Sequence, residues 1–90
     1  MDYAEGKVTI VGDGSTKEFE VKVKHGLASD KLVVKLKVRP ITKAPSYLFS
    51  YLSDEDEDGF YETLVITAKF NVPPAKGEKL TIHWKATIAG

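Results

Sequence analysis

A run of acidic residues with alternating aspartates is the feature of this sequence whose spacing most clearly could do chemistry. Residues 54–59 read Asp-Glu-Asp-Glu-Asp-Gly. Loops that open D-x-D-x-D-G hold calcium, because alternate carboxylates converge on one cation and the glycine permits a sharp turn. We therefore expect Asp54, Asp56 and Asp58 to be metal ligands for calcium. Glu62 joins them, at the position where a water-linked ligand usually lies.

The acidic run also departs from the complete calcium motif. Val65 stands where the bidentate glutamate would be, and no helical pattern flanks the loop, so the segment is not an EF-hand. The alternative is an acidic hairpin tip in which Asp58-Gly59 makes the turn and the carboxylates are solvated. A cation or a basic neighbour would relieve the repulsion among these acids, so the sequence leaves calcium, a salt-bridged contact and water open. No other cofactor is expected.

Cations gather on two segments that alternate in polarity, residues 18–25 and 31–39. If these segments pair as a hairpin, their outward lysines form one basic surface. Together with the acidic run, they give the residues expected at an interface: Lys22, Lys24, Lys35, Lys37, Arg39, Glu55 and Glu57. Because these opposite charges are complementary on two copies, we expect a protein partner, either a homo-oligomer or a larger assembly. Nucleic acid is not expected, since no exposed aromatic lies among these lysines and the net charge is zero.

The other reactive side chains lack the neighbours that catalysis needs. There is no cysteine, and His25 and His83 alone make no zinc site. No serine stands in a nucleophile-elbow context, and Gly12-Asp13-Gly14 is not followed by the helix that a phosphate loop requires. We therefore expect a non-enzymatic protein in which His25 hydrogen-bonds a turn and His83 lies at the surface.

Period-two alternation of apolar and polar residues predicts strands along most of the chain. It covers residues 18–25, 31–39, 60–70 and 79–88, with shorter candidates at 7–11 and 47–52. Strands with one apolar face must pack face against face, so the fold class is all-β. We expect a single antiparallel two-sheet β-sandwich, jelly-roll or Ig-like, with about six to eight strands. The core aromatics are expected to be Phe19, Phe49, Phe60, Phe70 and Trp84.

Length and composition limit the class further. The 90 residues predict one domain over residues 1–90. No apolar run reaches about 18 residues and no signal-peptide pattern opens the chain, so we expect a cytoplasmic protein with no membrane partner. The chain has no glutamine and a single asparagine, Asn71, beside many charged residues. That composition is typical of thermophile proteins.

Three short stretches resemble, in their order, a known group of proteins. They are VGDGSTKEF at 11–19, VKHGL at 23–27 and FNVPPAKGE at 70–78. This order resembles small β-sandwich domains of virion accessory proteins from tailed bacteriophages and related archaeal viruses, although the acidic run is an insertion in that pattern. The resemblance implies a structural role by assembly, in head decoration, tail or fibre. The alternatives are a calcium-dependent module for a ligand such as carbohydrate, with Tyr47, Tyr51 or Tyr61 nearby, and an orphan domain of unknown function.

Overall fold

The computed structural model describes residues 3–29 and 31–89, and it confirms the all-β class. The elements in chain order are β1 (Tyr3–Val11), β2 (Glu18–Lys24), β3 (Leu32–Arg39), the short 3-10 helix η1 (Ile41–Lys43), β4 (Tyr47–Ser53), β5 (Thr63–Lys69) and β6 (Lys79–Ile88). In the part of the chain so described, no helix is long and apolar enough to cross a membrane.

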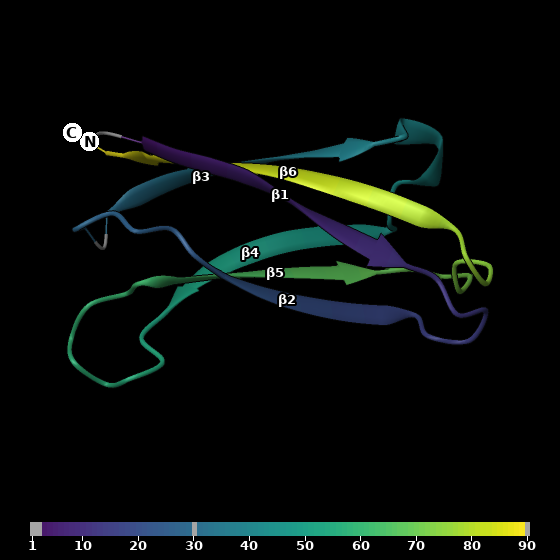
Figure 1. The fold of residues 1–90 in the computed structure, drawn as a ribbon, viewed down its shortest axis with the longest axis horizontal. Coiled ribbons are helices and arrows are strands. Elements are labelled where there is room, and N and C mark those ends of the chain that lie inside the picture. The colour runs from purple at the N-terminus through teal and green to yellow at the C-terminus, as the bar shows by residue number, and fades with distance from the viewer. Residues whose placement is uncertain (1–2, 30, 90) are drawn as a thin grey trace.

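The strands form two three-stranded antiparallel sheets that lie in two layers (Figure 1). In one layer β6 lies between β1 and β3, and in the other β5 lies between β2 and β4. The chain changes layer at every connection except the one between β4 and β5, which are paired neighbours. The acidic run therefore joins two strands of the same sheet, as a hairpin loop does.

The hairpin considered for residues 18–25 and 31–39 does not form. β2 pairs with β5, and β3 pairs with β6 in the other layer. Alternation identifies which residues share a face of a strand, but it does not identify the neighbouring strand. The expected basic surface is consequently divided between the layers, with Lys22 and Lys24 on one and Lys35, Lys37 and Arg39 on the other.

The core lies between the layers and is built from the inward side chains of the central strands. Leu64 and Ile82 are 0% exposed, and Ile66 is 1% exposed. Trp84 is buried on β6 against Gly6 of β1, where an added Cβ would come within 2.9 Å of the indole Nε1. β1 therefore includes Gly6, which the alternation of apolar residues does not predict to be in a strand. The glycine is suited to this position because it leaves room for the indole of Trp84.

The aromatic residues divide between the core and the surface. Phe19 and Phe70 pack against the core as an edge-to-face pair with ring centroids 5.8 Å apart, as expected. Phe49 and Phe60 are 45% and 67% exposed, so their expected place in the core is wrong. Phe49 lies on the outward face of the edge strand β4, and Phe60 precedes β5 in the loop. Residue type alone does not distinguish the two faces of an edge strand.

The Gly-rich turn after β1 and the Pro-rich turn before β6 lie against each other. The Gly12 N–H donates to the Glu78 carbonyl at 2.7 Å, and the Gly14 N–H donates to the Pro74 carbonyl at 2.8 Å. A Cβ on Gly12 would lie 2.3 Å from the Ala75 carbonyl oxygen, so only glycine fits there. These turns lie at the end of the molecule opposite the β4–β5 loop (Figure 1).

Candidate metal centre

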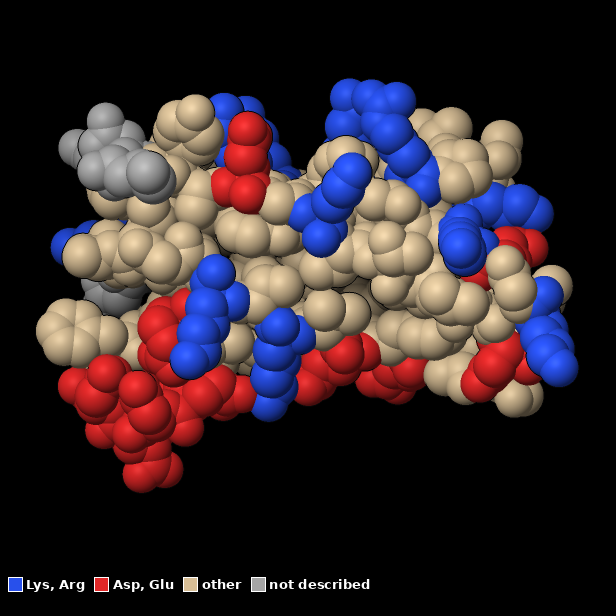
Figure 2. Space-filling model, in the orientation of Figure 1, with Lys and Arg blue, Asp and Glu red and all other residues tan. Residues whose placement is uncertain are grey.

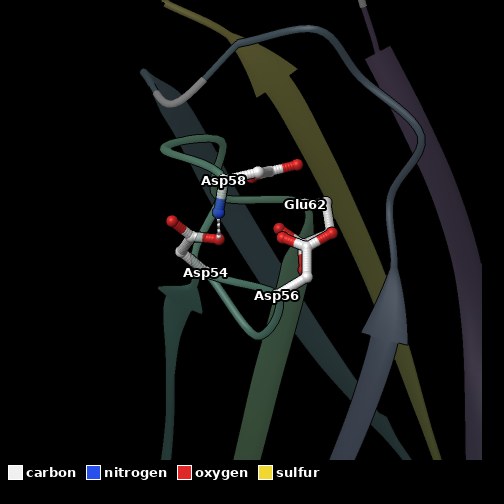
Figure 3. A group of neighbouring side chains, drawn as sticks. All are labelled: Asp54, Asp56, Asp58 and Glu62. Atoms are coloured by element: carbon white, nitrogen blue, oxygen red, sulfur yellow. Dashed lines mark hydrogen bonds between the residues drawn. The ribbon is translucent and has the colours of Figure 1, made fainter.

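The loop between β4 and β5, residues 54–62, brings the four predicted ligands together, and we call it the acidic loop. Asp54, Asp56, Asp58 and Glu62 each offer a carboxylate oxygen, and these oxygens all lie within 4.8 Å of one another (Figure 3). Two ligands on opposite sides of a calcium ion, each at about 2.4 Å, are about 4.8 Å apart. The four oxygens are therefore close enough to contact a single ion.

The backbone of the acidic loop folds around the first aspartate. The Asp54 carboxylate accepts hydrogen bonds from the N–H groups of Gly59 at 2.7 Å and Asp58 at 3.2 Å, the latter drawn in Figure 3. Gly59 has a φ of 90° and Glu57 a φ of 58°, both in the left-handed region. The glycine thus supplies the sharp turn that the motif requires, and the turn directs the later carboxylates back toward Asp54.

Glu62 closes the cluster from the other end of the loop, directly before β5. Its Oε1 accepts from the Glu55 N–H at 3.1 Å and from the Thr63 hydroxyl at 3.3 Å. Its Oε2 is buried and has no hydrogen-bond donor among residues 3–29 and 31–89. A buried carboxylate oxygen without a partner is costly, by about 1–3 kcal/mol or more. A cation bound in the cluster would remove that cost.

The carboxyl groups of the loop have different electrostatic surroundings. Loss of solvent, followed by the neighbouring Asp58 and Asp54 carboxyls, raises the pKa of Asp56. Loss of solvent also acts to raise the pKa of Asp54, but the Gly59 and Asp58 N–H donors outweigh it and hold that pKa below its ordinary value. Loss of solvent and the neighbouring carboxyls together therefore disfavour the ionised form of Asp56.

A lysine of β2 neutralises an acid that is not one of the predicted ligands. Lys22 forms an ion pair with Glu55, and its ammonium lowers the pKa of that carboxyl by a hydrogen bond. The Glu55 carboxylate in turn raises the pKa of Lys22. Both side chains are largely exposed, so the pair adds little to stability. It does leave the four converging carboxylates without a basic partner of their own among the described residues.

His25 forms hydrogen bonds to the C-terminal end of the acidic loop, at Tyr61 and Glu62. The side chain is 5% exposed, its Nδ1 accepts from the Leu27 N–H at 3.0 Å, and its Nε2 donates to the Tyr61 carbonyl at 2.6 Å. The His25 N–H also donates to the Glu62 carbonyl at 3.3 Å. The expected hydrogen bond to a turn is confirmed, and His83 is exposed as expected. The link to the loop was not predicted, because nothing in the sequence shows that residues 25 and 61 are neighbours.

The cluster is not a complete EF-hand site. Val65 belongs to β5 and is fully buried, so the chain offers no carboxylate at the position of the bidentate glutamate. Calcium takes about 6–8 oxygen ligands, which leaves places for backbone carbonyls and water beside the four carboxylates.

The outward face of the β1–β6–β3 sheet carries a second cluster of charge, which we call the basic face. Its cations are Lys7, Lys35, Lys37, Arg39, Lys79 and Lys85. Much of this face surrounds a shallow hollow of about 640 Å³. Lys7, Lys79 and Lys85 were not among the cations predicted to share this surface. The alternation of residues 79–88 marks Lys79 and Lys85 as outward, but it does not show that β6 lies beside β3.

An exposed aromatic row leads along β4 toward the acidic loop. Tyr47, Phe49 and Tyr51 are 66%, 45% and 49% exposed on the outward face of this edge strand. Tyr61 is 43% exposed on the far arm of the loop. The three tyrosines considered for a carbohydrate surface therefore lie beside the metal cluster or on the strand that enters it.

A scan against protein-family models finds no match, and neither the curated proteins nor the solved structures searched contain a similar chain. The likeness of the turn motifs to virion accessory domains therefore rests on those residues alone.

Proposed function

We propose that this chain is a non-enzymatic β-sandwich domain of the jelly-roll or Ig-like kind whose acidic loop binds calcium. The observation that carries the proposal is that four carboxylates, from residues spread over positions 54–62, converge to within 4.8 Å of one another. The buried Glu62 oxygen supports it independently, because none of the described residues donates a hydrogen bond to that oxygen.

The chemistry of the cluster favours calcium over magnesium. Calcium accepts several carboxylates in a flexible geometry, whereas magnesium demands a near-ideal octahedron and retains several of its waters. The loop is also exposed and free of cysteine and histidine ligands, which disfavours softer metals.

Calorimetric titration with calcium chloride tests this proposal. We expect saturable binding of one ion and a rise in melting temperature, because an ion that binds only the folded state stabilises it. At about 100 times the dissociation constant the stabilisation is about 2.7 kcal/mol, which raises the melting temperature of a domain this small by on the order of 10 °C. If millimolar calcium produces no heat of binding and no shift in the melting temperature, the proposal is rejected.

A matched pair of variants separates a specific site from diffuse attraction. Asp56→Asn removes a proposed ligand, whereas Glu57→Gln removes the same charge from the adjacent exposed residue, which is outside the converging set. We expect the first variant to lose most calcium affinity and the second to keep it. Equal losses in both would mean that only the summed charge of the loop attracts the ion.

The second candidate function is structural assembly, of the kind that the resemblance to virion decoration or tail domains implies. The segregation of charge favours it, since the basic face and the acidic loop belong to opposite layers. Acidic side chains gather most densely at the lower left corner of the molecule, while Lys and Arg side chains project along its upper margin, at its right end and beside the acids in the lower half (Figure 2). Such a molecule attracts other copies or an oppositely charged shell.

Light scattering at two salt concentrations tests the assembly function. We expect an oligomer at about 50 mM salt that dissociates near 1 M, where the Debye length is only about 3 Å. A strict monomer at high protein concentration and low salt would reject this second function, and it would leave the calcium proposal untouched.

A further inference from the structure

The basic face places like charges directly opposite one another. In the register of the sheet, Lys85 faces Lys35 on one side and Glu5 on the other, and His83 lies between Lys7 and Lys37. Neighbouring strands are about 4.8 Å apart, and like charges directly opposite are destabilising. Apart from Glu5, the described strand residues of this face include no acid to offset them.

The cations of this face also have no ionic partner among the residues that the structure describes. The ion pairs among residues 3–29 and 31–89 engage Lys22, Lys43 and Lys69, none of which belongs to the basic face. Lys85 lies 4.8 Å from the centroid of the Tyr3 ring, which is a weak interaction at an exposed site. The face therefore holds positive charge around a shallow hollow, and an anionic partner would relieve its repulsion.

We propose that the basic face is a docking surface for the acidic loop of a second copy of this chain. The loop carries five consecutive acids, and among the described residues the one ion pair that it makes joins Lys22 to Glu55. It extends beyond the β2–β5–β4 layer, on the side of the molecule away from the basic face (Figures 1 and 2). One copy thus cannot satisfy its own basic face, and the contact joins different surfaces of two molecules.

A second copy suits this face better than a nucleic acid does. Proteins that bind single strands combine a basic groove with aromatic side chains that stack on bases. Trp84 lines the hollow of the basic face but is only 8% exposed, so it offers little ring surface to a base, and Lys85 lies over the ring of Tyr3. The net charge of zero gives little long-range attraction to a polyanion, whereas opposite charges on opposite sides favour head-to-tail association.

Two charge-reversal variants test this contact. The face variant, K35E/K37E, keeps its acidic loop, and the loop variant, E55K/E57K, keeps its basic face and all four converging carboxylates. By light scattering at about 50 mM salt, each variant alone should be monomeric. An equimolar mixture should associate again, because the unmodified loop of the face variant can meet the unmodified basic face of the loop variant. The control K24E/K76E reverses two exposed lysines outside the basic face and should associate as the unmodified chain does.

Three results would overturn the proposal. The first is that either variant alone keeps the oligomer mass of the unmodified chain. The second is that the mixture of the two variants stays monomeric. The third is that the unmodified chain binds a fluorescent oligothymidine and K35E/K37E does not. The inference deepens the assembly function and does not involve the metal. Calcium titration of the monomeric face variant therefore shows separately whether the metal proposal holds.

Discussion

Glu62 is the residue whose environment in the folded chain is least complete without a ligand. One carboxylate oxygen accepts two hydrogen bonds, while the other is buried and accepts none from the described residues. We expect Glu62→Gln to weaken calcium binding at least about tenfold, because a charged ligand becomes neutral. The melting temperature without calcium should change little, since the variant removes a repelling charge. Calorimetry and thermal melts check both parts, and an unchanged affinity would remove Glu62 from the site.

Asp13 shows how a carboxylate behaves when backbone donors satisfy it. The Thr16 hydroxyl, and then the Thr16 and Ser15 N–H groups, lower the pKa of Asp13 from 3.8 to about 2. A folded pKa below the unfolded value contributes stability above about pH 4, and this contribution is lost as the pH falls toward 2.

A carboxyl titration by NMR measures this pKa directly. We expect Thr16→Val to raise the pKa of Asp13 toward its ordinary value, because the Thr16 hydroxyl is the largest cause of the shift. Ser15→Ala should change it far less, since it removes only a hydroxyl contact at 3.4 Å. Equal pKa values in the unmodified chain and in Thr16→Val would contradict the observed turn geometry.

At the scale of elements, His25 joins the end of β2 to the acidic loop across the sheet. Replacing it with alanine leaves the Leu27 N–H and the Tyr61 carbonyl without their partners and opens a cavity. We expect His25→Ala to lower the free energy of unfolding by about 2–3 kcal/mol and to weaken calcium binding. His83→Ala is the matched control, because His83 is exposed and should cost less than about 0.5 kcal/mol. Similar losses in both variants, measured by denaturant unfolding, would contradict this role.

Strands could be predicted from alternation, but their partners could not. Outward lysines and inward valines identify β2 and β3, yet the same pattern is compatible with a hairpin or with strands in different sheets. The extension of β1 through Gly6 was not predicted, because a glycine is needed there to leave space for the Trp84 indole and adds nothing to the alternation of apolar residues. Phe60 was misplaced because the loop continues to Glu62, so the residue lies outside the ladder.

The candidate site was more predictable than the strand order because its ligands lie close in sequence. The D-x-D-x-D-G spacing alone indicated Asp54, Asp56 and Asp58, and the loop geometry adds Glu62 to the cluster as expected. The supporting contacts were not predictable, since His25 and Lys22 reach the loop from strands distant in sequence. Such contacts depend on sheet order, which local patterns do not encode.

At the scale of the whole molecule, calcium and self-association would use the same acidic loop. An ion bound there neutralises part of the charge that attracts the basic face of another copy, so the two events should oppose each other. We expect calcium to reduce the oligomer mass at about 50 mM salt, beyond the effect of sodium chloride at equal ionic strength. Light scattering checks this, and a mass that rises with calcium would show that the ion strengthens the contact.

A calcium titration followed through backbone amide NMR signals tests whether the acidic loop is a specific calcium site. We expect saturable shifts confined to residues 54–62 and to their contacts at His25 and Lys22, with the largest change near Gly59. The signals of β1 and β6 should stay in place. Shifts that are absent, that never saturate, or that spread evenly over both sheets would contradict it.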